Sequence, residues 1–162
     1  MRPVGGQLNT AFETVCLPFS KAPSKEELLT FLEGSLAMQR YSRHLLNVLE
    51  QEGTLPSHYP FPVQVWQFGR DLKIIFLAGE VVVDYSLRLK AKFGFDNTWV
   101  AGYSNDVFAY IPSLRVLREG GYESGGSMIY YGHPSPFSTS VEEIIVDKVT
   151  ELVQRTTIAG QH

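Results

Sequence analysis

The chain has 162 residues, 44% of them hydrophobic and 19% charged, with a formal net charge of −3. Its length suits a single domain that buries roughly two-thirds of its unfolded surface, and its composition is that of an ordinary globular protein. The small negative charge gives no electrostatic reason to expect nucleic acid or an anionic membrane as a partner. We find neither the apolar core of a signal peptide nor an apolar run of transmembrane length. The sequence does not assign the protein to a cellular compartment.

The first predicted element is a short strand over residues 12–19 (FETVCLPF), which ends near Pro18. It contains Cys16, the only cysteine, so no internal disulfide can form. No histidine stands close to Cys16 in sequence. A buried structural thiol is therefore favoured over a nucleophile.

A helical segment follows. Ser24 and Glu27 have the spacing of a capping box, in which each side chain accepts from a backbone N–H of the other residue. Leucines then recur at helical spacing as far as Leu49; Gly34 could interrupt this helix, and Gly53 is its natural end. Because the segment is rich in charge as well as leucine, we expect it on the outside of the molecule.

The middle of the chain predicts a hairpin. Residues 54–62 contain three prolines and read as a connector. The runs 63–68 (VQVWQF) and 72–78 (LKIIFLA) predict two strands, since the Gly69-Arg70-Asp71 sequence between them is a strong turn signal. The second run is nearly all apolar, which is typical of a central strand.

Residues 81–94 favour a helix that ends at Gly94, and residues 97–101 favour the next strand. The order strand, helix, strand predicts a βαβ unit. A second capping box, Ser140 with Glu143, opens an amphipathic C-terminal helix. The prediction for residues 1–162 is therefore one α/β domain: a mixed sheet with a βαβ unit, an N-terminal hairpin and helix region, and a closing C-terminal helix.

Three polar signatures stand where these elements end: LAGE (77–80), WVAGYSNDVFAYIPS (99–113) and GGYESGGSMIYYG (120–132). In a βαβ unit the two strands are parallel, so their carboxyl ends open on one edge of the sheet. Ligands of open α/β sheets bind outside that edge. We therefore expect the Glu80 carboxylate to converge with four further side chains, those of Ser104, Asn105, Asp106 and Tyr110.

Several interpretations remain open for these residues. Glu80 could cap the following helix, bind a metal or act as a general base, or be a solvated loop residue. Asn105 and Asp106 form a turn more often than a site. Residues 120–126 (GGYESGG) match neither a Walker loop nor a dinucleotide fingerprint and are typical of a flexible loop. His133 is the only histidine near these signatures, and a packing role is favoured for it.

In this order the segments resemble the neutral/alkaline non-lysosomal ceramidase family, in the last part of its catalytic domain. There a Gly-Glu motif ends a strand, a helix and a strand lead to a Gly-x-x-Asn-x-x-x-x-Tyr segment, and a Tyr-Glu-(small residues)-Ser-x-x-Tyr-Gly loop precedes a closing helix. The resemblance is best over residues 63–155. The matching residues are Gly79 with Glu80, Gly102, Asn105, Tyr110, Tyr122 with Glu123, Ser127, and Tyr131 with Gly132.

The resemblance implies a zinc-dependent hydrolase that cleaves the amide of a ceramide-like lipid (N-acylsphingosine) to sphingosine and a fatty acid. It implies that Glu80 and Tyr110 are zinc ligands. Asn105, Tyr122 and Ser127 would then lie behind the ligands or on the substrate side.

The sequence also departs from the family. The family's two zinc histidines and its Asn-Pro-Gly-Asp-x-Ser-Pro motif lie upstream and have no counterpart here, and a shorter loop before Tyr110 suggests a divergent bacterial-type branch. The resemblance thus implies the C-terminal portion of a larger catalytic domain, with half of the metal site, inactive alone and associating with a histidine-bearing N-terminal half. The alternative, from another class, is a non-catalytic α/β module that binds a lipid or a protein.

Overall fold

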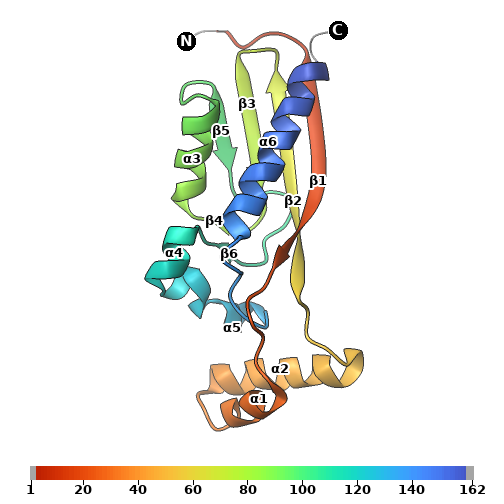
Figure 1. The fold of residues 1–162 in the computed structure, drawn as a ribbon, viewed down its shortest axis with the longest axis vertical. Helices are drawn as coiled ribbons and strands as arrows, with labels where there is room; N and C mark the ends of the chain where they lie inside the picture. The colour runs from red at the N-terminus through yellow and green to blue at the C-terminus, as the bar shows by residue number, and fades with distance from the viewer. Residues whose placement is uncertain (1–2, 160–162) are drawn as a thin grey trace.

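The structure is a computed structural model that describes residues 3–159 (Figure 1). None of the helices in this range is both long enough and apolar enough to span a membrane. The strands are β1 (Leu8–Pro18), β2 (His58–Phe68), β3 (Leu72–Leu77), β4 (Glu80–Val81), β5 (Thr98–Ala101) and β6 (Tyr110–Ile111). The helices are α1 (Lys25–Phe31), α2 (Leu36–Glu52), α3 (Val83–Phe93), α4 (Leu114–Glu119), η1 (Tyr122–Gly126), α5 (Met128–Tyr131) and α6 (Val141–Ala159).

The main sheet has the order β1-β2-β3-β5. β2 is antiparallel to both β1 and β3, whereas β5 runs parallel to β3 and is reached through α3. The predicted mixed sheet, βαβ unit and C-terminal helix are therefore confirmed. A second, two-stranded sheet pairs β4 with β6 in parallel.

The core lies between this sheet and the helices α3 and α6, which both pack against it (Figure 1). Val63 and Ile75 from the sheet, Leu89 from α3 and Leu152 from α6 are fully buried in one cluster. Tyr85 of α3 is also fully buried, and its hydroxyl donates to the Pro112 carbonyl at 3.0 Å. That bond ties α3 to the segment that follows β6.

The helices α1 and α2 lie apart from this core, at the end of the molecule opposite the termini (Figure 1). The capping box at α1 is confirmed: Glu27 N donates to the Ser24 hydroxyl and Ser24 N donates to the Glu27 carboxylate. The long helical segment is interrupted around Gly34, and α2 ends at Gly53 in the left-handed conformation. A separate small cluster of buried residues joins the two helices: Leu28, Tyr41, Leu45 and Leu55.

The prediction of a connector over residues 54–62 was wrong, because β2 already begins at His58. In this stretch β2 pairs only with β1, since its pairing with β3 starts at Val63. Where a strand has a neighbour on one side only, a proline can place its missing N–H on the unpaired side. Pro60 and Pro62 therefore fit within the strand.

The prediction that Cys16 is buried was also wrong, because its side chain is exposed. Successive residues of a strand point to opposite faces of the sheet. Val15 and Leu17 face α6 and the core, so Cys16 points to the other face, which none of the helices described here covers.

Two local predictions need smaller corrections. Glu80 and Val81 form β4, so the helix begins only at Val83. Residues 120–126 are not an open loop: Tyr122–Gly126 forms a wide helical turn, and α5 follows directly.

We expect Leu152→Ala to lower the free energy of unfolding by about 2–5 kcal/mol, because a fully buried side chain on α6 would leave a cavity against the sheet. Urea denaturation followed by circular dichroism measures this change. Leu36→Ala is the matched control, since Leu36 is 61% exposed on α2. Equal losses in the two variants would contradict the assignment of the core to the interface between α6 and the sheet.

Candidate functional site

The parallel pairing of β4 with β6 forms the centre of the candidate site. Glu80 lies directly opposite Tyr110 in this pairing. Glu80 N donates to the Ala109 carbonyl at 2.9 Å, and Gly79 N donates to the Asp106 carbonyl at 2.8 Å. Residues that are far apart in sequence are thus held side by side at the end of β3, as expected from the βαβ geometry.

Gly79 is required for this arrangement. Its φ is +64°, a left-handed backbone conformation that glycine adopts without strain. A Cβ at this position would lie 2.7 Å from the Ala109 carbonyl oxygen and 2.8 Å from Cγ1 of Ile111. The close approach of the two segments therefore depends on the absence of a side chain.

The loop after β5 folds back over the same edge. Tyr103 N donates to the Gly79 carbonyl at 2.8 Å, and Ser104 N donates to the Leu77 carbonyl at 3.1 Å. Tyr103 and Asn105 have φ values of 52° and 69°, which are uncommon for residues other than glycine. Such backbone strain persists where the surrounding structure holds it, and it is concentrated at functional sites.

The Glu80 carboxylate raises the pKa of two tyrosines, Tyr103 and Tyr110. A side-chain hydrogen bond to Glu80 is the main cause that raises the pKa of Tyr103 to about 12 and also raises the pKa of Tyr110. Both phenols are therefore neutral at physiological pH. The sequence analysis missed Tyr103, although it stands inside the Gly102–Asn105 motif, because nothing in the pattern showed that a left-handed residue would turn its ring toward Glu80.

More tyrosines surround this pair. The Tyr122 ring lies 5.5 Å from that of Tyr110 and 6.3 Å from that of Tyr130. Most of these rings are well exposed, from 41% for Tyr131 to 66% for Tyr130. We call the whole set the tyrosine rim: Tyr103, Tyr110, Tyr122, Tyr130 and Tyr131.

The remaining predicted site residues divide into two groups. Tyr122 belongs to the rim, and Ser127 lies beneath it, with its N–H donating to the Tyr122 carbonyl. The Ser127 side chain is buried, and its hydroxyl has no hydrogen-bond partner among residues 3–159. The Asn105 amide instead donates to Gln64 on β2 at 3.3 Å.

Asp106 likewise turns away from the rim. Its carboxylate accepts from the Tyr59 hydroxyl at 2.8 Å, and burial together with this carboxylate raises the pKa of Tyr59 to about 12. Ser104 donates to the Gly102 carbonyl within its own turn. Of the four side chains expected to converge on Glu80, only that of Tyr110 lies beside it in this way.

One alternative for Glu80 is not supported. The residue that caps α3 is Val82, and no side-chain hydrogen bond caps this helix. The acidic residue in the first turn of α3 is Asp84, which instead binds Arg115 at 2.9 Å and Ser113. Glu80 is therefore not the cap of α3.

His133 has a packing role. Its Nε2 donates to the Phe108 carbonyl at 2.9 Å, and its ring contacts those of Phe19, Tyr59 and Tyr131. Burial lowers the pKa of His133. A neutral, packed imidazole with one nitrogen already bonded is not placed as a free metal ligand.

Glu80 and Tyr110 alone do not make a zinc site. A carboxylate and a phenol lie side by side, and both can bind zinc through oxygen. Among residues 3–159, no three histidine, cysteine, aspartate or glutamate side chains are grouped so that they could hold a metal ion. A catalytic zinc usually has three protein ligands, so further donors would have to come from elsewhere.

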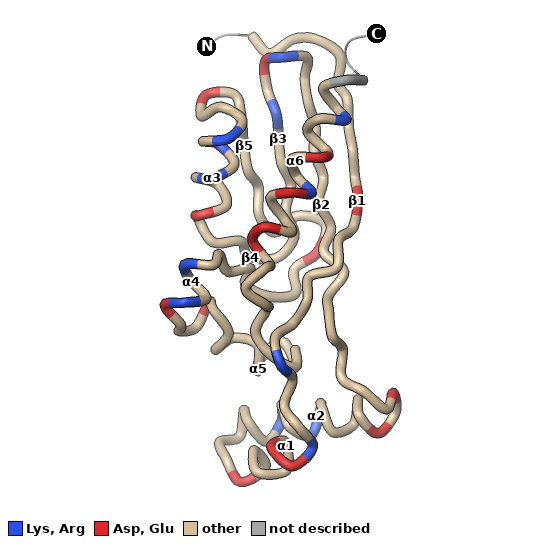
Figure 2. Tube along the Cα trace, viewed as in Figure 1, with Lys and Arg blue, Asp and Glu red and all other residues tan. Residues whose placement is uncertain are grey.

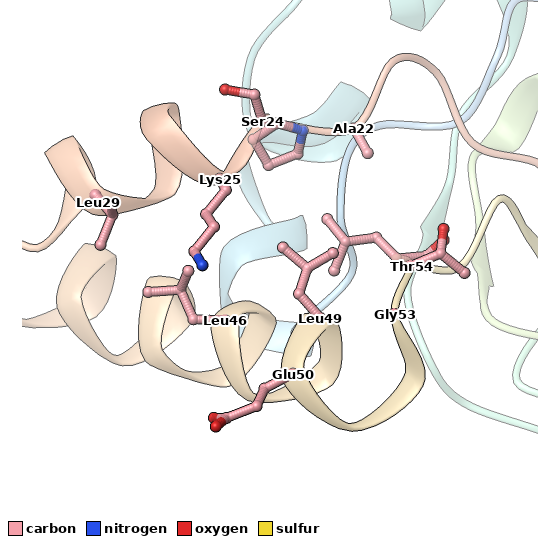
Figure 3. A pocket seen from close by; sticks show the side chains of 11 residues that line it. Ala22, Ser24, Lys25, Leu29, Leu46, Leu49, Glu50, Gly53 and Thr54 are labelled. Carbon is pink, nitrogen blue, oxygen red and sulfur yellow. The ribbon is translucent and has the colours of Figure 1, made fainter.

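A hollow of the described surface lies away from the rim, between α1 and α2 (Figure 3). It is an open groove of about 720 Å³ with leucines on both sides. Leu29 of α1 and Leu46 and Leu49 of α2 line it. Its volume suits a ligand, and polar residues such as Lys25 and Glu50 also line it. None of the three polar signatures lies there, so we place the candidate site at Glu80.

Comparisons with protein-family models, with curated proteins and with solved structures returned no significant match. The candidate site is therefore supported by its geometry and by the motifs in the sequence.

We expect Gly79→Ala to destabilise the protein more than Gly53→Ala does. Both glycines have a left-handed φ, so both variants lose roughly 1 kcal/mol from backbone strain. Only at Gly79 would the new Cβ also collide with backbone, which adds about 1–3 kcal/mol. Urea denaturation measures the difference, and equal effects would show that β4 and β6 are not in close contact.

We expect Glu80→Gln to lower the pKa of Tyr103 and of Tyr110, because a carboxylate disfavours the phenolate and an amide does not. The ultraviolet absorbance of tyrosinate, followed against pH, would then rise at lower pH in the variant. Glu123→Gln serves as the control, since Glu123 is an exposed residue of η1. Superimposable titration curves for wild type and Glu80→Gln would contradict the contact between Glu80 and the phenols.

Proposed function

We propose that this chain is the C-terminal portion of a ceramidase-like, zinc-dependent amide hydrolase and contributes Glu80 and Tyr110 to its metal site. The observation that carries the proposal is the direct pairing of these two residues across β4 and β6. They are also the two positions at which the family resemblance implies zinc ligands. The strand pairing and the sequence motif thus both support the proposal of this pair.

In this proposal each residue has a distinct task. Glu80 offers an anionic oxygen, and Tyr110 offers a phenol oxygen whose proton a nearby dication would make easier to remove. A bound zinc ion would polarise the amide carbonyl and lower the pKa of a bound water. Two histidines from outside this chain would complete the ligand set.

The tyrosine rim suits an amphiphilic amide. A tyrosine ring has an apolar body and a hydroxyl that needs a polar partner, so exposed rings can contact both an alkyl chain and a polar head group. Tyr122 contacts Tyr110 and would lie on the substrate side. Asn105 and Ser127 would act behind the ligands, where Asn105 holds its loop against Gln64.

The alternative, a non-catalytic α/β module that binds a lipid or a protein, has one observation in its favour. The leucine-lined groove between α1 and α2 could hold an apolar group without any chemistry at Glu80. Under this alternative, changes at Glu80 would leave ligand binding intact.

The proposal is tested with the chain alone and after co-expression with the histidine-bearing polypeptide of the same genome that resembles the preceding part of a ceramidase catalytic domain. We expect the isolated chain to hold less than one equivalent of zinc and to leave a short-chain N-acylsphingosine intact. The purified complex should hold one zinc and hydrolyse this substrate. Metal analysis and release of the fatty acid are the measurements.

Variants of the complex test whether zinc binding and hydrolysis depend on Glu80 and Tyr110. Glu80→Gln should lose both zinc and hydrolysis, and Tyr110→Phe should weaken zinc binding. Tyr130→Phe removes an exposed rim hydroxyl and should retain zinc, which makes it the matched control. Amide hydrolysis by the isolated chain, or full zinc occupancy in the Glu80→Gln complex, would refute the proposal.

A further inference from the structure

The main sheet has one face that the described helices leave uncovered, here named the open face. It consists of the even-numbered residues of β1, β2 and β3 together with Trp99 and Ala101 of β5, as the strand registers show. The core cluster contains side chains of the opposite face, and α3 and α6 both pack there. The open face is thus the second side of a sheet whose first side is already buried.

The open face carries no Asp, Glu, Lys or Arg. The charged residues of these strands, Glu13 and Lys73, lie instead on the core side of the sheet. β2 is free of charged residues along its whole length (Figure 2). A sheet with one solvated face normally shows polar residues on that face, whereas apolar residues on both faces are typical of a sheet buried on both sides.

Large aromatic side chains mark this surface. Phe12 is 52% exposed and Trp99 is 60% exposed. Between them the rings of Trp66 and Phe76 contact each other edge to face, with centroids 4.9 Å apart. A row of aromatic residues across an uncharged sheet face is typical of an inter-sheet or protein contact.

The area of the open face approaches that of a standard protein interface. With strands about 4.8 Å apart and about 3.3 Å per residue, four strands of these lengths cover roughly 500 Å² in projection. Protruding side chains make the accessible area larger than this projection. A standard protein interface buries about 800 Å² on each partner, so the open face could supply most of one.

The open face is also continuous with the candidate site. Gln64 of β2 belongs to it. The side-chain Oε1 of Gln64 accepts a hydrogen bond from the side-chain amide of Asn105, in the loop between β5 and β6. A layer that covers the sheet therefore reaches the loop that holds Glu80 beside Tyr110. The same polypeptide could cover the apolar surface and bring the ligands that the site lacks.

We propose that the open face is the docking surface for a second β-sheet layer, supplied by the polypeptide that brings the histidine ligands to Glu80 and Tyr110. The identity of this partner rests on the proposed function; the need for an apolar, sheet-like partner rests on the open face alone. Thr10, Thr14 and Gln64 give this face polar groups that a protein layer can hydrogen-bond and an alkyl chain cannot.

Cys16 reports directly on this proposal, because the only cysteine of the chain is exposed on the open face. In the isolated chain it should react readily with a thiol reagent such as 5,5′-dithiobis(2-nitrobenzoate). In the complex with the histidine-bearing polypeptide, loss of access should slow the reaction by at least about tenfold. Phe12→Lys should abolish association, whereas Leu87→Lys, at a similarly exposed apolar residue of α3, should not.

Each other outcome overturns this inference. Cys16 that stays reactive in the complex, or no association at all, would show that the partner does not cover the open face. Protection in the isolated chain at concentrations where ultracentrifugation shows dimers would assign the face to a second copy. Protection by phosphatidylcholine vesicles would assign it to a lipid surface.

The same samples separate this inference from the proposed function. A complex that protects Cys16 but holds no zinc refutes the metal site and leaves the docking surface in place. A complex that holds zinc through Glu80 while Cys16 remains reactive refutes only the docking surface.

Discussion

The candidate site depends on one constraint, the parallel crossover from β3 through α3 to β5. It brings the segments after β3 and after β5 to the same edge of the sheet, where backbone hydrogen bonds then align them residue by residue. Gly79 makes the final approach possible, because its backbone lies against the Ala109 carbonyl with no room for a side chain. Glu80 and Tyr110 are neighbours as a consequence of this backbone arrangement.

The electrostatics of the rim follow from that placement. A carboxylate beside two phenols disfavours the phenolates and so raises the pKa of both tyrosines. A dication would reverse the balance, since it stabilises the carboxylate and favours loss of the phenol proton.

The sequence predicted the elements whose signals are local. The Ser24–Glu27 capping box, the turn at residues 69–71 and the helix end at Gly94 all appear where their residues require them. Each signal involves residues a few positions apart, so no tertiary information is needed.

The errors arose where tertiary context decides. The prolines of β2 are tolerated because β3 does not extend beside them, which no local pattern reveals. Cys16 was assigned to the core because one strand alone does not show which of its faces a helix covers. The contact of Tyr103 with Glu80 needed a left-handed backbone at a tyrosine, a conformation that residue preferences argue against.

Under the proposed function, a partner would have to cover two surfaces of the chain. The main sheet buries one face and presents a second face that has aromatic residues and no charge. The rim offers two adjacent oxygen donors where a catalytic zinc usually takes three protein ligands. Gln64 and Asn105 join these two surfaces through a hydrogen bond. Because one contact links them, a single covering layer would satisfy both: it would remove the apolar face from water and bring the additional donors to Glu80 and Tyr110.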